Sequence, residues 1–238
     1  MSIGTTDINP IVLIPACMTS NRLPNKPMMD IGGAPMIVQV WRRAMEAGIG
    51  PVLVAADSHE IAQVIRDAGG DAVVTNPVHP SGSDRICEAL EHFDPNHRYN
   101  IVVDVQGDLP TIDPAIIRSV LDPLQDPAVD ISTLAVEITE ESQKDNPNVV
   151  KVVGVKIGPK RLKALYFTPR QGTARRRHPL SSHRPLRLSP QGARNLQRPA
   201  GFPARRPGAS RTVAGARSRH EDRCGRGRGH PAGCGYHG

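Results

Sequence analysis

Short apolar segments alternate with longer amphipathic segments over the first 168 residues of the chain. The apolar segments are three to eight residues long and rich in Val and Ile, which is typical of strands buried in a parallel sheet. Residue types that start and stop helices lie between them. The expected strands are 11–14, 51–56, 72–74 and 101–105, then 131–138, 149–155 and 162–167, and the expected helices begin at Pro35, Ser58, Ser81 and Asp113.

This alternation predicts an α/β protein of three layers, in which helices cover both faces of a mostly parallel sheet. Ligands of such sheets bind outside the carboxyl ends of the strands. We therefore expect the functional residues in the loops that follow Ile14, Val74 and Val105. No apolar run approaches the roughly 18 residues of a membrane-spanning helix, and four scattered cysteines without a secretory leader indicate a cytoplasmic protein.

The net charge of +7 divides unevenly along the chain. Residues 1–168 hold 21 acidic residues against 14 Lys plus Arg, which gives −7. Residues 169–238 hold 16 Arg, no Lys and two acidic residues, which gives +14. This second segment has no Ile, one Val, 11 Gly and 8 Pro, so it has too few large apolar side chains to form a packed core.

The loop after the first strand carries two cations four residues apart, Arg22 and Lys26. A guanidinium fork and an ammonium group suit the clamping of a triphosphate, although ordinary surface cations in a solvated loop look the same in sequence. The loop contains neither the P-loop motif nor the glycine motif of dinucleotide-binding folds.

Two further loops carry residues with a chemical interpretation and a simpler structural one. The Ser81-Gly82 turn at a helix start exposes backbone N–H groups to a polar ligand, or else provides only a helix N-cap. Asp108, next to Gly107 after a strand, suits a Mg²⁺ ion held mainly by phosphates and water, or else is a turn residue.

Several stretches of these residues resemble the sugar-activating cytidylyltransferases, and most closely the 3-deoxy-manno-octulosonate (Kdo) cytidylyltransferase family of lipopolysaccharide synthesis. Residues 14–37, IPACMTSNRLPNKPMMDIGGAPMI, match the opening of the family, except that Cys17 stands where the family has an Arg. The other matching stretches are HPSGSDR at 79–85, VQGDLP at 105–110, NPNVVKVV at 146–153 and LYFT at 165–168.

The resemblance implies transfer of CMP from CTP to Kdo, with release of pyrophosphate and with Mg²⁺ as cofactor. It also implies a role for particular residues, with Lys26 and Asp108 as the catalytic pair. The implied contacts are Arg22 and Lys26 for the phosphates, Ser81, Gly82 and Arg85 for the rest of the nucleotide, Gln106 and Lys151 for the sugar, and Asp108 for the metal.

The resemblance ends at Thr168. Pro169 follows where the family has an Arg that holds the sugar carboxylate, and the chain has no Asp-Thr-Pro, the motif of the family's second metal ligand. Residues 181–186, SSHRPL, are what one codon choice for the family's Tyr-His-His-Ile-Gly-Leu-Tyr encodes when it is read from its third base. We therefore expect 1–168 to form a truncated nucleotidyltransferase core, incomplete at its C-terminal end, and 169–238 to be an irregular, out-of-frame tail.

On this interpretation the family's homodimer interface is lost and the transferase is impaired or inactive. Two other interpretations of the tail remain open. An arginine- and glycine-rich segment can bind nucleic acid through phosphate charge, which would make the chain a non-enzymatic binding protein on a nucleotide-fold remnant, but one Phe and one Tyr offer little base stacking. The residues His220, Cys224, His230 and Cys234 are zinc-ligand types, but their spacing is short for a zinc finger.

Overall fold

A computed structural model describes residues 8–19, 23–168, 180–181, 187–188 and 210–215 of the chain. In chain order, its strands and helices are β1 Pro10–Ala16, the 3-10 helix η1 Lys26–Met28, α1 Met36–Ala47, β2 Val52–Ala56, α2 His59–Asp67, β3 Asp71–Val74, α3 Gly82–Phe93, β4 Ile101–Asp104, α4 Pro114–Ser119, the 3-10 helix η2 Asp122–Gln125, β5 Val129–Glu137, α5 Glu141–Asp145, β6 Lys151–Gly158, β7 Arg161–Thr168, β8 Leu180–Ser181, β9 Arg187–Leu188 and β10 Ser210–Gly215.

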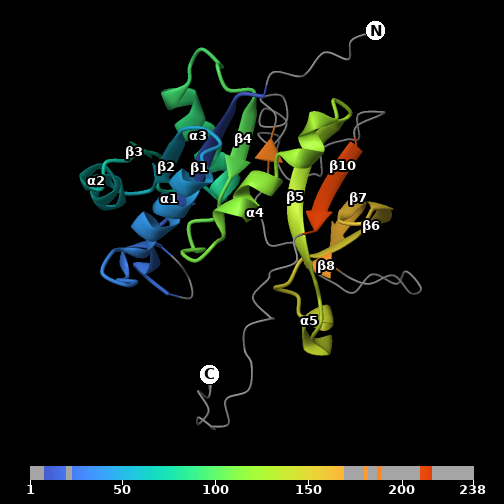
Figure 1. Cartoon of the computed structure of the whole chain (residues 1–238). Helices are drawn as coiled ribbons and strands as arrows, with labels where there is room; N and C mark the ends of the chain where they lie inside the picture. Colours follow the sequence, from blue (N-terminus) through green and yellow to red (C-terminus); the bar gives the residue numbers. More distant parts are fainter. Residues whose placement is uncertain (1–7, 20–22, 169–179, 182–186, 189–209, 216–238) are drawn as a thin grey trace.

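The first sheet has the strand order β3-β2-β1-β4-β9. Its first four strands are parallel, with Val12 of β1 opposite Val52 of β2 and Val103 of β4, while β9 pairs antiparallel with β4. The right-handed βαβ crossovers that parallel strands require place helices over the sheet (Figure 1). The predicted three-layer α/β fold with a mostly parallel sheet is confirmed.

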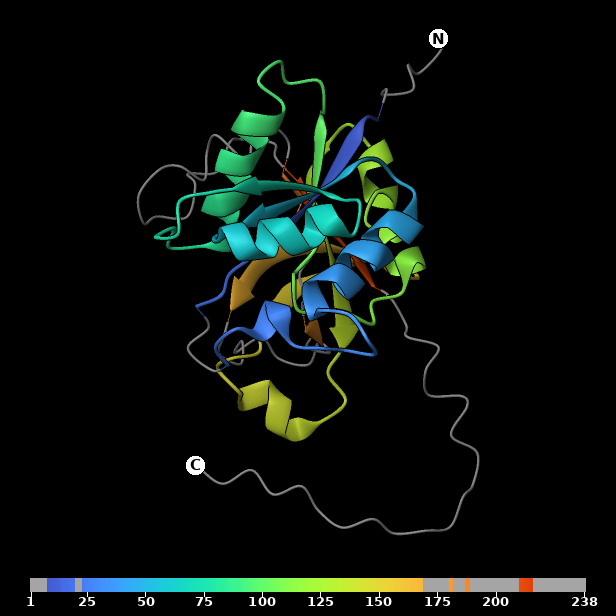
Figure 2. The ribbon, with the colours of Figure 1, turned by 90° about the vertical axis from the view of Figure 1, so that its left-hand side faces the viewer.

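Alternate residues of the strands point to opposite faces of this sheet, so it builds two separate cores. On β1, Val12 and Ile14 face the core that is completed by α1, α2 and α4. Ile11 and Leu13 face the core completed by α3. All four side chains are fully buried, which explains why β1 is apolar at successive positions rather than alternating. Figure 2 shows the ribbon with helices on both sides of this sheet.

The later strands form a second unit, a closed barrel in the order β10-β5-β8-β6-β7. The strands expected at 131–138, 149–155 and 162–167 are present as β5, β6 and β7. The expectation that they continue the parallel sheet is wrong. Only Pro159 and Lys160 separate β6 from β7, and so short a connection forces the two strands to run antiparallel.

Helix boundaries follow the predicted caps, with two differences. The Ser58 and Ser81 side chains accept hydrogen bonds from the N–H groups of Ile61 and Asp84, as N-caps do. Pro35 is itself the N-cap of α1 rather than its first helical residue. The helix expected to begin at Asp113 ends at Ser119 and a 3-10 turn follows, because Pro123 has no N–H to continue the helical hydrogen bonds.

Three short strands lie beyond Thr168, so the expectation of an irregular segment is wrong at β8, β9 and β10. The ten residues pair with β4, β5, β6 and β7. The four residues considered as zinc ligands, and most of the arginines of this segment, lie outside the described residues. Within the described part of the chain, no helix is long and apolar enough to cross a membrane.

Candidate nucleotide-binding site

Three loops meet around Pro15, near the carboxyl end of β1. A Cβ atom added to Gly107 would lie 2.6 Å from the Pro15 carbonyl oxygen, closer than real contacts allow. A Cβ atom on Gly82, at the start of α3, would lie 3.3 Å from the Pro15 ring. The absence of a side chain at position 107 therefore lets the loop after β4 approach the loop after β1 closely.

Lys26 and Asp108 form an ion pair across two of these loops. Lys26 Nζ donates to Asp108 Oδ2 at 2.9 Å, with the two side chains 34% and 49% exposed. The loop reaches this position through a left-handed turn at Asn25 (φ 57°), whose N–H donates to the Met18 carbonyl. Because an exposed pair contributes only about 0–1 kcal/mol, its charges remain available to a ligand. The two catalytic candidates therefore lie side by side at the edge of the sheet.

The residues present suit a magnesium ion that is bound mostly through a nucleotide. Among the described residues, no three His, Cys, Asp or Glu side chains are grouped as a metal cage would need. Asp108 offers one half-exposed carboxylate at the mouth of the phosphate loop. Mg²⁺ is commonly held by one or two carboxylates with phosphate and water oxygens completing the shell, and a single aspartate fits that mode.

The first turn of the loop after β1 is attached to the neighbouring strand. The Met18 N–H donates to Asp57 Oδ2 at 2.9 Å, and the Asp57 N–H donates back to the Ala16 carbonyl. Cys17 lies between Ala16 and Met18 in the chain and is partly exposed, with its thiol in contact with Thr19. Arg22, the other predicted phosphate ligand, lies outside the described residues.

Arg85 is 3% exposed, whereas Lys26, Ser81 and Gly82, the other described candidates for nucleotide contact, are partly or fully exposed. Its Nη1 donates to Thr75 Oγ1 at 2.7 Å and to the Asn76 carbonyl at 3.3 Å. Thr75 in turn donates its hydroxyl to the Ala56 carbonyl at the end of β2. The guanidinium thus holds the loop between β3 and α3, and a direct contact of Arg85 with a nucleotide stays a prediction.

The other two predicted nucleotide contacts lie at the start of α3. Ser81 and Gly82 are exposed, and the Ser81 hydroxyl exchanges hydrogen bonds with Asp84. The structure is compatible with both interpretations of this turn, as a helix N-cap and as a contact for a polar ligand. The Ser81 side chain caps α3, and the exposed turn lies against Pro15.

The predicted sugar contacts lie on two different elements. Gln106 Nε2 donates to both carboxylate oxygens of the buried Asp104, at 3.0 and 3.1 Å. Lys151 begins β6 and is 1% exposed, with Nζ donating to the Asn146 carbonyl at 2.5 Å. It lies opposite Thr168 of β7 in the register of the barrel. Gln106 therefore belongs to the loop cluster around Pro15, and Lys151 to the second unit.

Sequence reasoning missed three residues of this region. Asp57 follows β2 as Asp108 follows β4, so its position at a strand end was a usable signal. His79 stood in a matched motif without an assigned role, and its Nε2 contacts the Glu88 carboxylate. Glu88 lies one turn after Arg85 on α3, and no local pattern marks it.

Fold and loops together define an α/β protein with a mostly parallel sheet and a cation, Lys26, in the loop after β1. A family model described as cytidylyltransferase matches residues 11–205, a range that extends beyond Thr168. The chain belongs to this cytidylyltransferase family.

Curated relatives are similar over about two thirds of the chain. The 3-deoxy-manno-octulosonate cytidylyltransferase of Methylobacterium radiotolerans is 62% identical over 160 residues, which are 67% of this chain and 65% of the relative. The enzyme of the same name from Rhodospirillum rubrum is 63% identical over 161 residues, covering 67% and 64%. The match thus spans just under two thirds of the length of these relatives.

Solved structures are similar over more of the chain. The structure of CMP:2-keto-3-deoxy-manno-octonic acid synthetase complexed with CTP has a TM-score of 0.76 and 29% identity, covering 87% of this chain and 90% of its own. UDP-glucose pyrophosphorylase complexed with UDP-glucose has a TM-score of 0.62 at 14% identity, which shows a shared fold alone.

Proposed function

We propose that this chain binds CTP at the loops around Pro15 and derives from an enzyme that transfers CMP from CTP to Kdo. The observation that carries the proposal is the Lys26–Asp108 pair, 2.9 Å apart, beside the close approach of Gly107 to Pro15. The pair brings together a cation that would bind phosphate and a carboxylate that would bind the Mg²⁺ counter-ion of the phosphate. Both lie at the carboxyl ends of parallel strands, where such sheets bind ligands. The high identity to relatives named for this activity supports the choice of CTP and Kdo.

In the proposed reaction the anomeric hydroxyl of Kdo attacks the α-phosphorus of CTP. A bond from the sugar oxygen to phosphorus forms, the bond from the α-phosphorus to the bridging oxygen breaks, pyrophosphate leaves, and the hydroxyl proton is lost to solvent. Catalysis of this kind consists mainly of positioning and charge neutralisation. Lys26 would hold phosphate oxygens, and Gln106, fixed by Asp104, would present its remaining amide atoms to the sugar side.

Asp108 is the residue that would hold a Mg²⁺ ion. When bound, the ion would neutralise phosphate charge and favour the departure of pyrophosphate. The chain supplies the carboxylate at the strand end and the nearby Lys26 ammonium, which fixes the orientation of that carboxylate. A reaction that consumes CTP in this way belongs in the cytoplasm.

We further propose that transfer by this chain is impaired while CTP binding is retained. Pro169 stands where the resemblance implies an arginine for the carboxylate of the sugar acid. The loops assigned to CTP all precede that position. Positioning of two substrates can supply about 7–11 kcal/mol of the barrier reduction, so weakening one substrate's pocket forfeits a large part of it.

The test measures CTP binding by calorimetry and pyrophosphate release in the presence of CTP, Kdo and Mg²⁺. A protein translated from a gene with the reading frame restored after the codon for Thr168 serves as the control. We expect both proteins to bind CTP and only the control to release pyrophosphate rapidly. Comparable release rates would overturn the impairment, and absence of CTP binding by both would overturn the proposed function.

A further inference from the structure

We propose that Glu88 and His79 hold the loop Thr75–Pro80 in the conformation that presents the start of α3 to the nucleoside part of CTP. Glu88 and His79 are positioning residues in this proposal, which rests on the function proposed above. Neither residue has been given a role by the motif resemblance.

The Glu88 carboxylate binds the loop at two points. Its Oε2 and Oε1 atoms accept the Asn76 N–H at 3.0 and 3.2 Å, and Oε2 also contacts His79 Nε2. The Glu88 and His79 side chains are only 26% and 20% exposed. One carboxylate on the helix therefore fixes a backbone group at one end of the loop and a side chain near its other end.

Arg85 binds the same loop from the same face of α3. It lies three residues before Glu88, so the two side chains are neighbours on the helix surface. Its guanidinium donates to Thr75 Oγ1 and to the Asn76 carbonyl, and a longer contact of 3.5 Å reaches the Pro77 carbonyl. Arg85 thus holds carbonyl and hydroxyl oxygens, while Glu88 holds the Asn76 N–H. Side chains of the helix therefore bind both backbone polar groups of Asn76, its N–H and its carbonyl oxygen.

Glu88 is ionised under neutral conditions, which strengthens the hydrogen bonds that it accepts. Partial burial raises the pKa of Glu88, but hydrogen bonds from His79 and the Asn76 N–H, together with the charges of His79 and His92, bring it below its ordinary value. An ionised acceptor forms the stronger type of hydrogen bond. The restrained loop runs directly into Ser81, the N-cap of α3.

The position of the loop 75–80 indicates which part of a nucleotide would lie next to it. Gly82 packs against the ring of Pro15, whereas Gly107 packs against the Pro15 carbonyl oxygen. The phosphate candidates Lys26 and Asp108 belong to the Gly107 side. A nucleotide with its phosphates at Lys26 therefore extends its ribose and base toward Ser81 and Gly82, whose backbone orientation depends on the loop that Glu88 holds.

Calorimetry with two probes, CTP and inorganic tripolyphosphate, both with Mg²⁺, tests this role. The variant Glu88→Ala is expected to weaken CTP binding about tenfold, which corresponds to roughly 1.4 kcal/mol, and to leave tripolyphosphate binding within about twofold. Glu88→Gln keeps an acceptor for the Asn76 N–H and should stay within about threefold of the parent protein for CTP. His79→Ala should weaken CTP selectively, as Glu88→Ala does. Glu91→Ala, an exposed glutamate on the same helix, is the matched control and should bind both probes normally.

The outcomes separate the inference from the function on which it rests. Selective loss of CTP affinity with rescue by Glu88→Gln supports the positioning role. If Glu88→Ala binds CTP like the parent, or loses both probes equally, the inference is overturned while CTP binding by the parent stands. If the parent itself does not bind CTP, the proposed function fails and the inference with it. Should Glu88→Ala not fold, the comparison of Glu88→Gln with His79→Ala decides by the same criteria.

Discussion

The parallel-sheet unit (β1–β4 with its helices) and the barrel unit (β5–β8 with β10) differ most in how they bury apolar side chains. In the parallel-sheet unit, two large clusters fill both faces of the sheet, and many members have no exposed surface. In the barrel unit the separate buried cluster consists of Ala135, Val152 and Ala164. Leu162 and Phe167 are partly buried against this cluster. Four other large apolar side chains of β6 and β7 are 41–55% exposed: Val155, Ile157, Leu165 and Tyr166.

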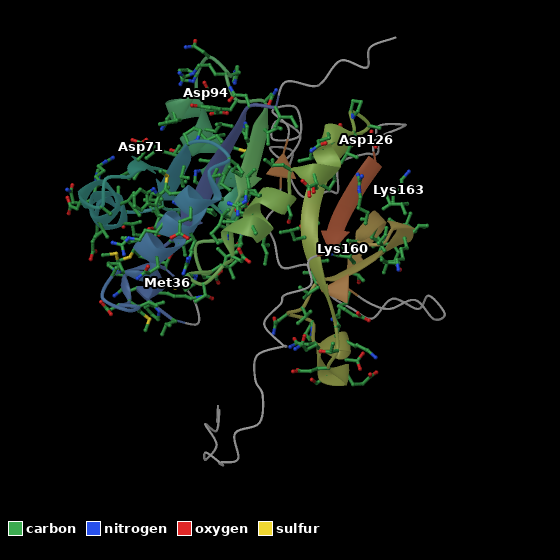
Figure 3. The ribbon with its side chains drawn as sticks, viewed as in Figure 1. Met36, Asp71, Asp94, Asp126, Lys160 and Lys163 are labelled. Carbon is green, nitrogen blue, oxygen red and sulfur yellow. The ribbon has the colours of Figure 1, made fainter. Side chains whose placement is uncertain are left out.

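This difference indicates which unit contributes most to the free energy of folding. Burial of apolar area is the main favourable term in folding, so the parallel-sheet unit carries most of it. The loops of the candidate site around Pro15 belong to that unit, whereas Lys151 belongs to the barrel. The candidate nucleotide loops therefore belong to the unit with the larger buried core. Figure 3 shows the two units with their side chains, with Asp71 and Asp94 on the first and Lys160 and Lys163 on the second.

The largest effect is expected from a matched pair of leucine truncations. Leu53 on β2 is 1% exposed and Leu165 on β7 is 55% exposed. Leu53→Ala should lower the free energy of unfolding by about 2–5 kcal/mol through lost burial and a cavity. Leu165→Ala should change it by less than about 0.5 kcal/mol. Urea denaturation followed by circular dichroism measures both, and similar losses would mean that the two units share one core equally.

Lys26→Ala should weaken CTP binding by about 10- to 100-fold, because a charge-assisted contact worth roughly 1.5–3 kcal/mol is removed. Lys160→Ala removes the same charge from the turn of the barrel unit and should leave CTP affinity unchanged. Calorimetry with CTP and Mg²⁺ makes the comparison. Equal weakening by both variants would show that overall charge, rather than the Lys26 position, attracts the nucleotide.

Two glycine substitutions test whether the backbone of the barrel unit affects CTP affinity. A Cβ atom at Gly107 would lie 2.6 Å from the Pro15 carbonyl oxygen, and one at Gly154 would lie 2.4 Å from the Lys163 carbonyl oxygen. Each alanine variant should lose about 1–3 kcal/mol of stability, since the backbone must move apart. Only Gly107→Ala should also reduce CTP affinity. Loss of affinity in Gly154→Ala would instead couple β6 and β7 to the nucleotide loops.

The smallest effect concerns acid stability in the parallel-sheet unit. Burial raises the pKa of Asp94, but the N–H groups of Tyr99 and Arg98 and the Arg98 guanidinium bring it below its ordinary value of 3.8. A pKa lowered by folding stabilises the native state at pH values above 3.8, and this stabilisation is lost as pH falls through the lowered value. Asp94→Asn should therefore be less stable than the parent at pH 7, with the gap closing below pH 3.8. Urea titrations at several pH values measure the gap, and a gap constant with pH would contradict the assignment.

The strands of the parallel-sheet unit could be predicted from sequence because their residues are buried on both faces. A segment such as Ile11–Ile14 is then apolar at every position, and the caps Ser58 and Ser81 mark the helices beside it. The barrel could be predicted only as separate strands. Its closure depends on which edges pair, and strand β10 pairs with β5 across more than 70 intervening residues.

The candidate site shows the same limit. Lys26 and Asp108 were expected at one sheet edge, and the structure joins them. The burial of Arg85 could not be predicted, because it depends on how the loop Thr75–Pro80 folds back over α3. Glu88 gave no signal because its partners are a backbone N–H and a histidine nine residues away, and neither produces a local pattern.

The Lys26–Asp108 pair also bears on the speed with which an anion arrives. Opposite charges 2.9 Å apart nearly cancel at distances beyond the Debye length of about 8–10 Å at moderate salt. The pair therefore contributes little long-range steering, which otherwise raises association rates steeply at low ionic strength. A phosphate would meet the lysine only on collision and could bind beside the carboxylate, because an ammonium group has three donors and Asp108 accepts from one of them. The rate of anion entry at this position should therefore depend only weakly on salt.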